Sequence, residues 1–184
     1  MVLKVQDNIQ ENGQIAREMC ELGLWQEVLA FAQQWHLDQP TDYKALYYMG
    51  IGFSGLNQFR KAESAYRRAL TIDPSAVKVW NNLAGILFDH MNCELEGIRC
   101  MEQSLQIDSN HKLGWSNLAL MAGQIGQYDK AMSCAEKAIE LDSEFVEAHL
   151  HKGRAALALG KTGIVEEVCH KLASIKPEKF FRPR

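Results

Sequence analysis

The sequence has no long apolar run, little proline and no excess of one charge. Its apolar stretches, such as 155–159, are too short to cross a bilayer, and its 184 residues include only 4 prolines and 13 glycines. Lys and Arg number 20 against 23 Asp and Glu, a balance that disfavours nucleic acid as a partner. The first ten residues lack the apolar core of an export signal. We therefore predict a cytoplasmic protein that neither inserts into a membrane nor binds nucleic acid.

Cysteine and histidine do not occur in the spacings that metal sites need. The five cysteines are Cys20, Cys93, Cys100, Cys134 and Cys169. They are widely spread within apolar helical patterns, which indicates reduced packing thiols rather than disulfides. No C-x2-C, H-x3-H or HExxH pattern occurs, and the letters G-x-G-x-x-G at 50–55 come after no strand. We predict no metal, no cofactor and no enzymatic activity.

A segment of about 34 residues recurs along the chain. Leu70-Thr-Ile-Asp-Pro-Ser75 returns as Leu105-Gln-Ile-Asp-Ser-Asn110, as Ile139-Glu-Leu-Asp-Ser-Glu144 and, more weakly, as Ala173-Ser-Ile-Lys-Pro-Glu178. The steps are 35, 34 and 34 residues, so one additional residue lies between Pro74 and Leu105. A period of this length is typical of stacked helix pairs.

Each period reads as two amphipathic helices joined by a tight turn. Residues that tolerate the left-handed backbone conformation mark the turns; they are Gly23, Asn57, Gly126 and Gly160. Residues 89–94 replace this turn in the third period, where we expect a longer or bulged corner. Small residues recur where the first helices approach a neighbour, at Ala16, Gly50, Ala84, Ala119 and Gly153.

These columns resemble the tetratricopeptide repeat (TPR) over residues 9–178. The best copy, 43–76, carries Leu46, Met49, Gly50, Phe53, Ala62, Tyr66, Ala69 and Pro74 on pattern. The resemblance implies an all-α, right-handed superhelical solenoid of about five antiparallel helix pairs. We predict an N-terminal extension over 1–8, repeats over 9–42, 43–76, 77–111, 112–145 and 146–179, and a tail over 179–184. His149 stands in the tryptophan column of the last repeat and is more polar than an inner copy would permit.

The resemblance also implies a non-enzymatic protein–protein interaction module or adaptor. The first helix of each repeat would line a concave groove that binds extended segments of partner proteins. The exposed stripe of these helices starts with Gln10, Gln14 and Arg17. Further along it, the candidate partner-binding residues are Lys44, Tyr47, Tyr48, Ile51, Lys78, Asn81, Asn82, Phe88, Ser116, Asn117, Leu120, His151 and Arg154.

Two parts of this stripe suggest a ligand chemistry. Lys44, Tyr47, Tyr48 and Lys78 would suit a segment with acidic and apolar side chains, although a solvated helical face explains them as well. Asn82 and Asn117 share one column, which resembles the asparagine ladder of some peptide-binding TPR grooves, although exposed asparagines on a helix surface explain them as well.

The chaperone-binding subclass of TPR proteins is a poor match. Its carboxylate-binding pattern needs asparagine at Ile51 and Gly85 and lysine at Leu113.

Two other functions stay open. One is a small TPR carrier chaperone for an export or assembly client, and the other is a homo-oligomeric scaffold that associates through its terminal repeats. Few residues come after Pro177, so the last helix lacks a full capping helix. Phe180 and Phe181 would fold back onto it, or two chains would cover each other's ends. The residues to be covered are Val165, Cys169 and Leu172.

Overall fold

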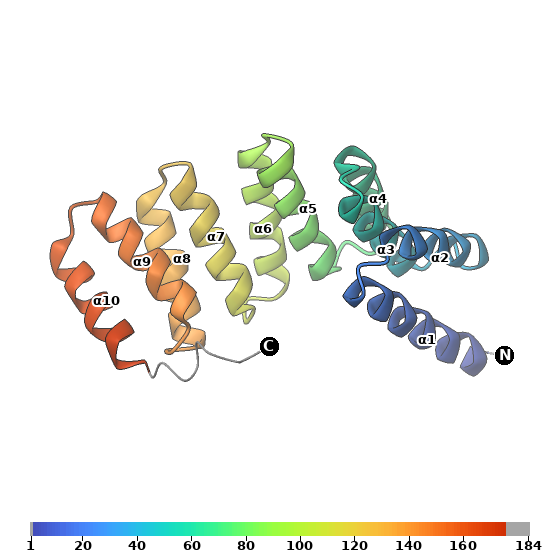
Figure 1. Cartoon of the computed structure of the whole chain (residues 1–184), viewed down its shortest axis with the longest axis horizontal. Coiled ribbons are helices and arrows are strands. Elements are labelled where there is room, and N and C mark those ends of the chain that lie inside the picture. Colours follow the sequence, from blue (N-terminus) through green and yellow to red (C-terminus); the bar gives the residue numbers. More distant parts are fainter. Residues whose placement is uncertain (1, 176–184) are drawn as a thin grey trace. The chain divides into compact units, whose positions relative to one another are not determined.

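The structure is a computed structural model that describes residues 2–175, with side chains from Glu11 onward. That part of the chain is all-α, with no strand (Figure 1). Its ten helices are α1 (Val2–Glu21), α2 (Trp25–Asp38), α3 (Tyr43–Gly55), α4 (Phe59–Ile72), α5 (Val77–His90), α6 (Glu94–Ile107), α7 (Lys112–Gln124), α8 (Tyr128–Leu141), α9 (Val146–Ala158) and α10 (Thr162–Ser174). The predicted all-α fold of five helix pairs is confirmed. Because α1 starts at Val2, the expected N-terminal extension is helical and continues into the first helix. Phe180 and Phe181 lie outside the described residues.

The chain divides into two compact units, a first unit of residues 1–100 and a second unit of residues 101–184. In the first unit α2 packs against α3, α3 against α4 and α4 against α5, and α1 contacts both α2 and α3. In the second unit α7, α8, α9 and α10 pack in order, and α7 also contacts α9. Within each unit these helices meet their sequence neighbours, and the first helices of consecutive pairs meet in α1 with α3 and in α7 with α9, as expected for stacked repeats.

The turns within the helix pairs confirm the residues predicted for them. Gly23, Asn57, Gly126 and Gly160 all have φ between 57° and 79°. After each of them a backbone N–H donates to a carbonyl five residues back, as Gln58 does to Phe53. This is the hydrogen bond that closes a helix before a left-handed residue.

The third corner holds the additional residue of the 35-residue step. Asn92 supplies the left-handed conformation with φ 52°. Here the N–H of Cys93 donates to the carbonyl of Leu87, six residues back rather than five. The expected longer corner is therefore confirmed and the insertion lies between Leu87 and Cys93.

The turns between helix pairs are closed by a recurring side-chain hydrogen bond. Trp80 Nε1 donates to the carbonyl of Pro74 at 2.8 Å, and Trp115 Nε1 donates to that of Ser109 at 2.8 Å. His149 occupies the same column, and its Nε2 lies 3.0 Å from the carbonyl oxygen of Ser143. His149 is buried. The expectation that it is too polar for an inner position is wrong, because its ring nitrogen makes the bond that the indole makes elsewhere.

The cysteines agree with the packing interpretation only in part. Cys100 and Cys134 are buried, and burial raises the pKa of each to about 11. Cys169 is exposed on α10, which corrects its assignment as a packing thiol. Within the described residues no three His, Cys, Asp or Glu side chains gather as metal ligands. Nor does any described helix have the length and apolar character of a membrane span.

Candidate partner-binding groove

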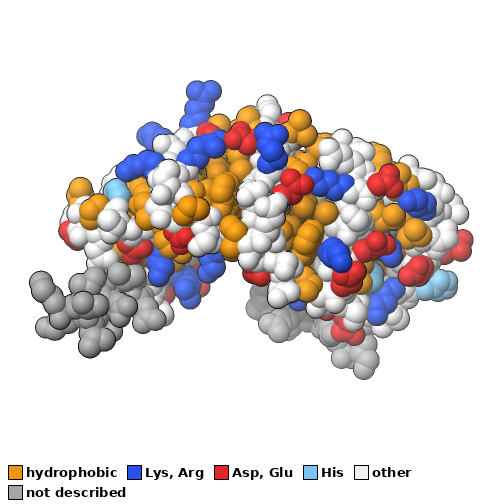
Figure 2. Space-filling model, turned by 180° about the vertical axis from the view of Figure 1, so that it is seen from behind, with side chains coloured by type: hydrophobic (Ala, Val, Ile, Leu, Met, Phe, Trp, Pro, Cys, Tyr) orange, Lys and Arg blue, Asp and Glu red, His pale blue; other side chains and the backbone are white. Residues whose placement is uncertain are grey.

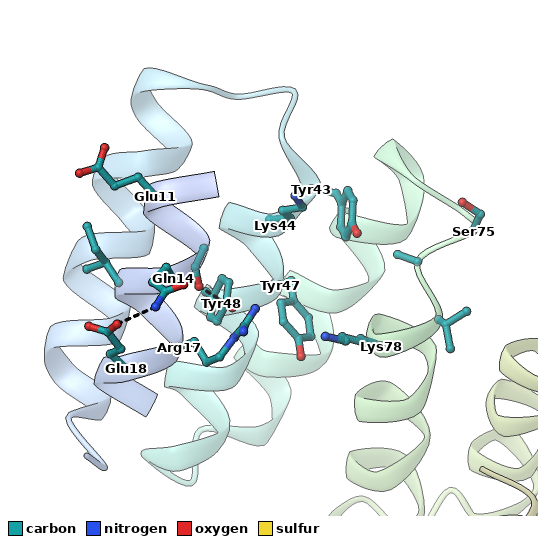
Figure 3. Close-up of a pocket in the computed structure, with 14 residues that line it drawn as sticks. Glu11, Gln14, Arg17, Glu18, Tyr43, Lys44, Tyr47, Tyr48, Ser75 and Lys78 are labelled. Carbon is teal, nitrogen blue, oxygen red and sulfur yellow. Dashed lines mark hydrogen bonds between the residues drawn. The ribbon is translucent and has the colours of Figure 1, made fainter. Parts of the chain in front are cut away.

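The first unit contains a groove of about 860 Å³ between α1, α3 and the start of α5 (Figure 3). Five side chains form its centre, and we call them the tyrosine groove: Arg17, Lys44, Tyr47, Tyr48 and Lys78. Their positions result from the repeat, because α1, α3 and α5 are the first helices of consecutive pairs. The sequence predicts that Lys44, Tyr47, Tyr48 and Lys78 share a groove. The structure brings these four residues together.

The tyrosine rings form a wall that is fixed by packing. Tyr48 stacks on Trp35 with ring centroids 6.0 Å apart, and Tyr47 meets Tyr48 edge to face at 5.1 Å. Tyr47 also lies 6.3 Å from the ring of Tyr66. The Tyr48 hydroxyl donates to the carbonyl of Gly13 at 3.0 Å, which ties α3 to α1. Rings held on several sides lose little conformational freedom when a ligand binds.

The phenols of this wall stay protonated at neutral pH. Burial, helped by the neighbouring Tyr48, raises the pKa of Tyr47 to about 12. Burial also raises the pKa of Tyr43 and of Tyr48. A protonated phenol donates one hydrogen bond. Tyr48 donates its own to Gly13, so Tyr47 is the phenol that presents a donor as well as aromatic area to the groove.

The centre of the tyrosine groove is cationic and its α1 edge is acidic. Figure 3 shows Arg17 and Lys78 extending toward Tyr47 from opposite sides. Glu11 and Glu18 lie along α1, where Glu18 accepts a hydrogen bond from Gln14 at 2.9 Å. Among side chains 11–175, no ion pair engages Arg17, Lys44 or Lys78. Arg17 hydrogen-bonds the Tyr48 hydroxyl, and Lys44 and Lys78 are available to an anionic ligand.

Three more predicted residues line a neighbouring recess of about 400 Å³ in the first unit, namely Ile51, Asn81 and Asn82. The Asn82 amide donates to the Tyr66 hydroxyl at 3.3 Å. A hydrogen bond from Asn82 also works against the burial that raises the Tyr47 pKa. The Asn82 amide therefore holds tyrosine side chains in place. The interpretation of Asn82 as part of an asparagine ladder does not include this role.

Three of the predicted residues are buried. Tyr48 is 9% exposed, Phe88 is 8% exposed and Ser116 is 3% exposed. Phe88 packs directly on α6, where a Cβ added at Gly97 would lie 2.9 Å from the Phe88 Cβ. A helical wheel for α5 alone misses this contact, because the space that Phe88 fills is left by Gly97, a glycine on the next helix.

The remaining predicted residues lie in the second unit. Leu120, His151 and Arg154 line a recess of about 160 Å³ with Tyr128, and Asn117 is exposed on α7. Burial, with the charge of Arg154 as the second cause, lowers the pKa of His151. The predicted stripe is thus a series of local recesses within each unit.

Some lining residues of the tyrosine groove were missed by the sequence analysis. Tyr43 is one of them. It directly precedes Lys44 at the start of α3, and this position next to a predicted groove residue could have identified it. The turn residues Ser75, Ala76 and Val77 also line the groove, and no periodicity identifies them. Beyond the groove, charges of both signs are intermingled with hydrophobic side chains on the face in Figure 2.

Comparison with known proteins identifies the repeat. Family models described as tetratricopeptide repeat match residues 47–91 and 114–145. The chain is 19% identical over 104 residues to the tetratricopeptide repeat-containing protein trd-1 of Caenorhabditis elegans, covering 56% of this chain and 13% of that protein. It is 29% identical over 106 residues to SPINDLY of Hordeum vulgare, a probable UDP-N-acetylglucosamine–peptide N-acetylglucosaminyltransferase, covering 54% of this chain. The chain spans only 11–13% of the length of these relatives.

Solved structures share the fold over nearly the whole chain. The MamA RS-1 ArsTM double mutant superposes with a TM-score of 0.80 at 19% identity, covering 92% of this chain and 95% of that one. YrrB, a TPR protein with an unusual peptide-binding site, superposes with a TM-score of 0.74 at 15% identity, covering 90% and 85%. At these identities the likeness concerns the fold alone.

Proposed function

The chain is a tetratricopeptide-repeat protein, a fold that serves as a protein–protein interaction module, and we propose that it is a non-enzymatic adaptor. Its ligand is an extended segment of a partner protein that carries acidic and apolar side chains. The tyrosine groove carries this proposal, because one hollow combines three cations with a wall of protonated phenols.

The chemistry of the groove favours a carboxylate flanked by apolar groups. Arg17 and Lys78 reach toward Tyr47 from two sides, so an anion between them gains charge-assisted hydrogen bonds. The ring of Tyr47, which the buried Tyr48 supports from behind, offers aromatic area to a neighbouring apolar side chain. YrrB, which shares the fold, has a peptide-binding site of its own, and this supports peptide binding as the activity. The carrier-chaperone and scaffold functions stay predictions.

A peptide-display selection tests the proposal. Random peptides are selected on the immobilised protein, and the winners are sequenced. We expect enrichment of Asp or Glu next to aromatic or aliphatic residues. Affinity should weaken as salt rises, because part of the attraction is between exposed charges.

A pair of charge-reversal variants supplies the control. Arg17→Glu with Lys78→Glu should weaken binding of the selected peptides at least about tenfold, because each lost charge-assisted bond contributes about 1.5–3 kcal/mol. Arg99→Glu with Lys137→Glu makes the same change in net charge outside the groove and should leave affinity unchanged. Equal losses in both variants would refute the groove as the binding site.

A further inference from the structure

The second unit has a recess at a position that a phenylalanine fills in the first unit. Phe88 of α5 stands eight residues after Trp80. Gly123 of α7 stands eight residues after Trp115, which makes the same hydrogen bond as Trp80. Phe88 is buried and packs against Gly97 of α6. At Gly123 the chain provides no side chain, and a recess of about 160 Å³ lies there.

The recess has the size and the walls of a site for one aromatic ring. Apolar side chains from three consecutive helices line it, namely Leu120 of α7, Ala131 of α8 and Ala155 of α9. Ala131 and Ala155 are at most 2% exposed and share a core cluster. An apolar cavity of about 150 Å³ binds benzene, so the volume suits a phenyl group. We call this site the Gly123 recess, after the residue that leaves it open.

A cation lies beside these apolar walls. Arg154 of α9 lines the Gly123 recess and is exposed. Over the described side chains, 11–175, no ion pair engages Arg154. Glu147 lies seven residues earlier on the same helix, about two turns away. An anion is therefore attracted to the Arg154 end of the recess, where a carboxylate gains a charge-assisted hydrogen bond.

The recess of about 400 Å³ in the first unit lacks this chemistry. Gly85 stands there at the repeat position of Arg154, so the cation is missing. Asp89 also lines that recess and adds a negative charge. An apolar pocket next to a cation is thus specific to the Gly123 recess among the two.

We propose that the Gly123 recess binds a phenylalanine side chain of a partner protein, with a carboxylate next to that phenylalanine held by Arg154. A ring that enters the recess gives its apolar walls the dispersion contacts that they lack. Tyr128 also lines the recess and is 37% exposed, so it offers the incoming ring an aromatic neighbour. This site lies within the second unit and does not depend on the tyrosine groove or on the proposed function.

The peptide acetyl-Gly-Asp-Phe-Asp-Gly-amide is a probe of this site. It is titrated into the full chain with isotope-labelled alanine methyl groups and followed by nuclear magnetic resonance. An aromatic ring displaces the resonance of a methyl group that it covers, so we expect shifts at Ala131 and Ala155. Replacing the peptide's Phe by Ala should weaken binding at least about tenfold, because the burial of the ring is lost. Replacing both Asp by Asn should weaken it about two- to fivefold, since Arg154 is exposed.

Filling the recess with a side chain of the protein supplies the matched test. A Cβ added at Gly123 would lie 3.7 Å from the Ala131 Cβ, an ordinary contact. Gly123→Leu should therefore fold normally, occupy the space of the ligand and abolish the peptide-induced shifts. Gly85→Leu makes the same change on α5, where an added Cβ meets no atom within 4 Å, and should bind the peptide like the parent chain. Far-ultraviolet circular dichroism checks that both variants keep the helical content of the parent.

A third variant separates the charge from the shape of the site. Arg154→Gln should lower the affinity for the Asp peptide to that for the Asn peptide and keep the shift at Ala131. Unmoved Ala131 and Ala155 methyl resonances at millimolar peptide would overturn the proposal. Binding of the peptide to the Gly123→Leu chain with unchanged affinity would overturn it as well.

Discussion

At the scale of single residues, one hydrogen bond explains why different side chains occupy the same column. Trp80, Trp115 and His149 all reach a backbone carbonyl six residues earlier. A carbonyl oxygen only accepts, so the His149 Nε2 carries the proton and donates. Each residue in this column therefore places a ring N–H within hydrogen-bonding distance of the carbonyl. Histidine does so with a smaller ring than tryptophan.

The variant His149→Phe tests this assignment. It keeps an aromatic ring in a buried position and removes the donor to Ser143. We expect the free energy of unfolding to fall by about 1 kcal/mol, the net contribution of such a bond, as measured by urea denaturation. His170→Phe on the exposed side of α10 is the control and should change stability little. An unchanged midpoint for both would show that the bond contributes nothing.

At the scale of helices, glycine positions separate close packing from open surface. A Cβ added at Gly50 of α3 would lie 2.3 Å from the Tyr66 Cε1, inside a buried ring. A Cβ added at Gly85 of α5 would meet no atom within 4 Å. Gly50 thus lets α3 and α4 approach closely, whereas nothing in the packing requires glycine at Gly85.

Alanine at these two positions should therefore have opposite effects. Gly50→Ala should lower the free energy of unfolding by about 1–3 kcal/mol through overpacking against Tyr66. Gly85→Ala should raise it by about 0.5–1 kcal/mol, because alanine loses less backbone entropy in a helix. Both are read from urea denaturation of the full chain. Effects of the same sign would contradict the packing described for α3 and α4.

At the scale of the whole molecule, periodicity predicted the helix pairs, because each pair repeats the same packing columns. The turns at Gly23, Asn57, Gly126 and Gly160 could be predicted from local backbone chemistry, and the step of 35 residues located the longer corner. The turns and the longer corner can both be predicted from the residues of one or two repeats.

Accessibility was harder to predict, because it depends on the helix opposite. The burial of Phe88 depends on Gly97 of α6, and Asn82 is engaged by Tyr66 of α4. A stripe drawn on one isolated helix contains neither contact. Lys44, Tyr47, Tyr48 and Lys78 were placed together correctly because they lie on consecutive first helices, where the period alone brings them to one side.

The central claim is that the tyrosine groove of the first unit binds an acidic, extended segment. Its most direct test is the pattern of amide chemical-shift changes when a display-selected peptide is titrated into the isotope-labelled chain. The account predicts that the largest shifts lie at Arg17, Lys44, Tyr47, Tyr48 and Lys78. Largest shifts on α4, α8 or α10, with those five amides unmoved, would contradict it.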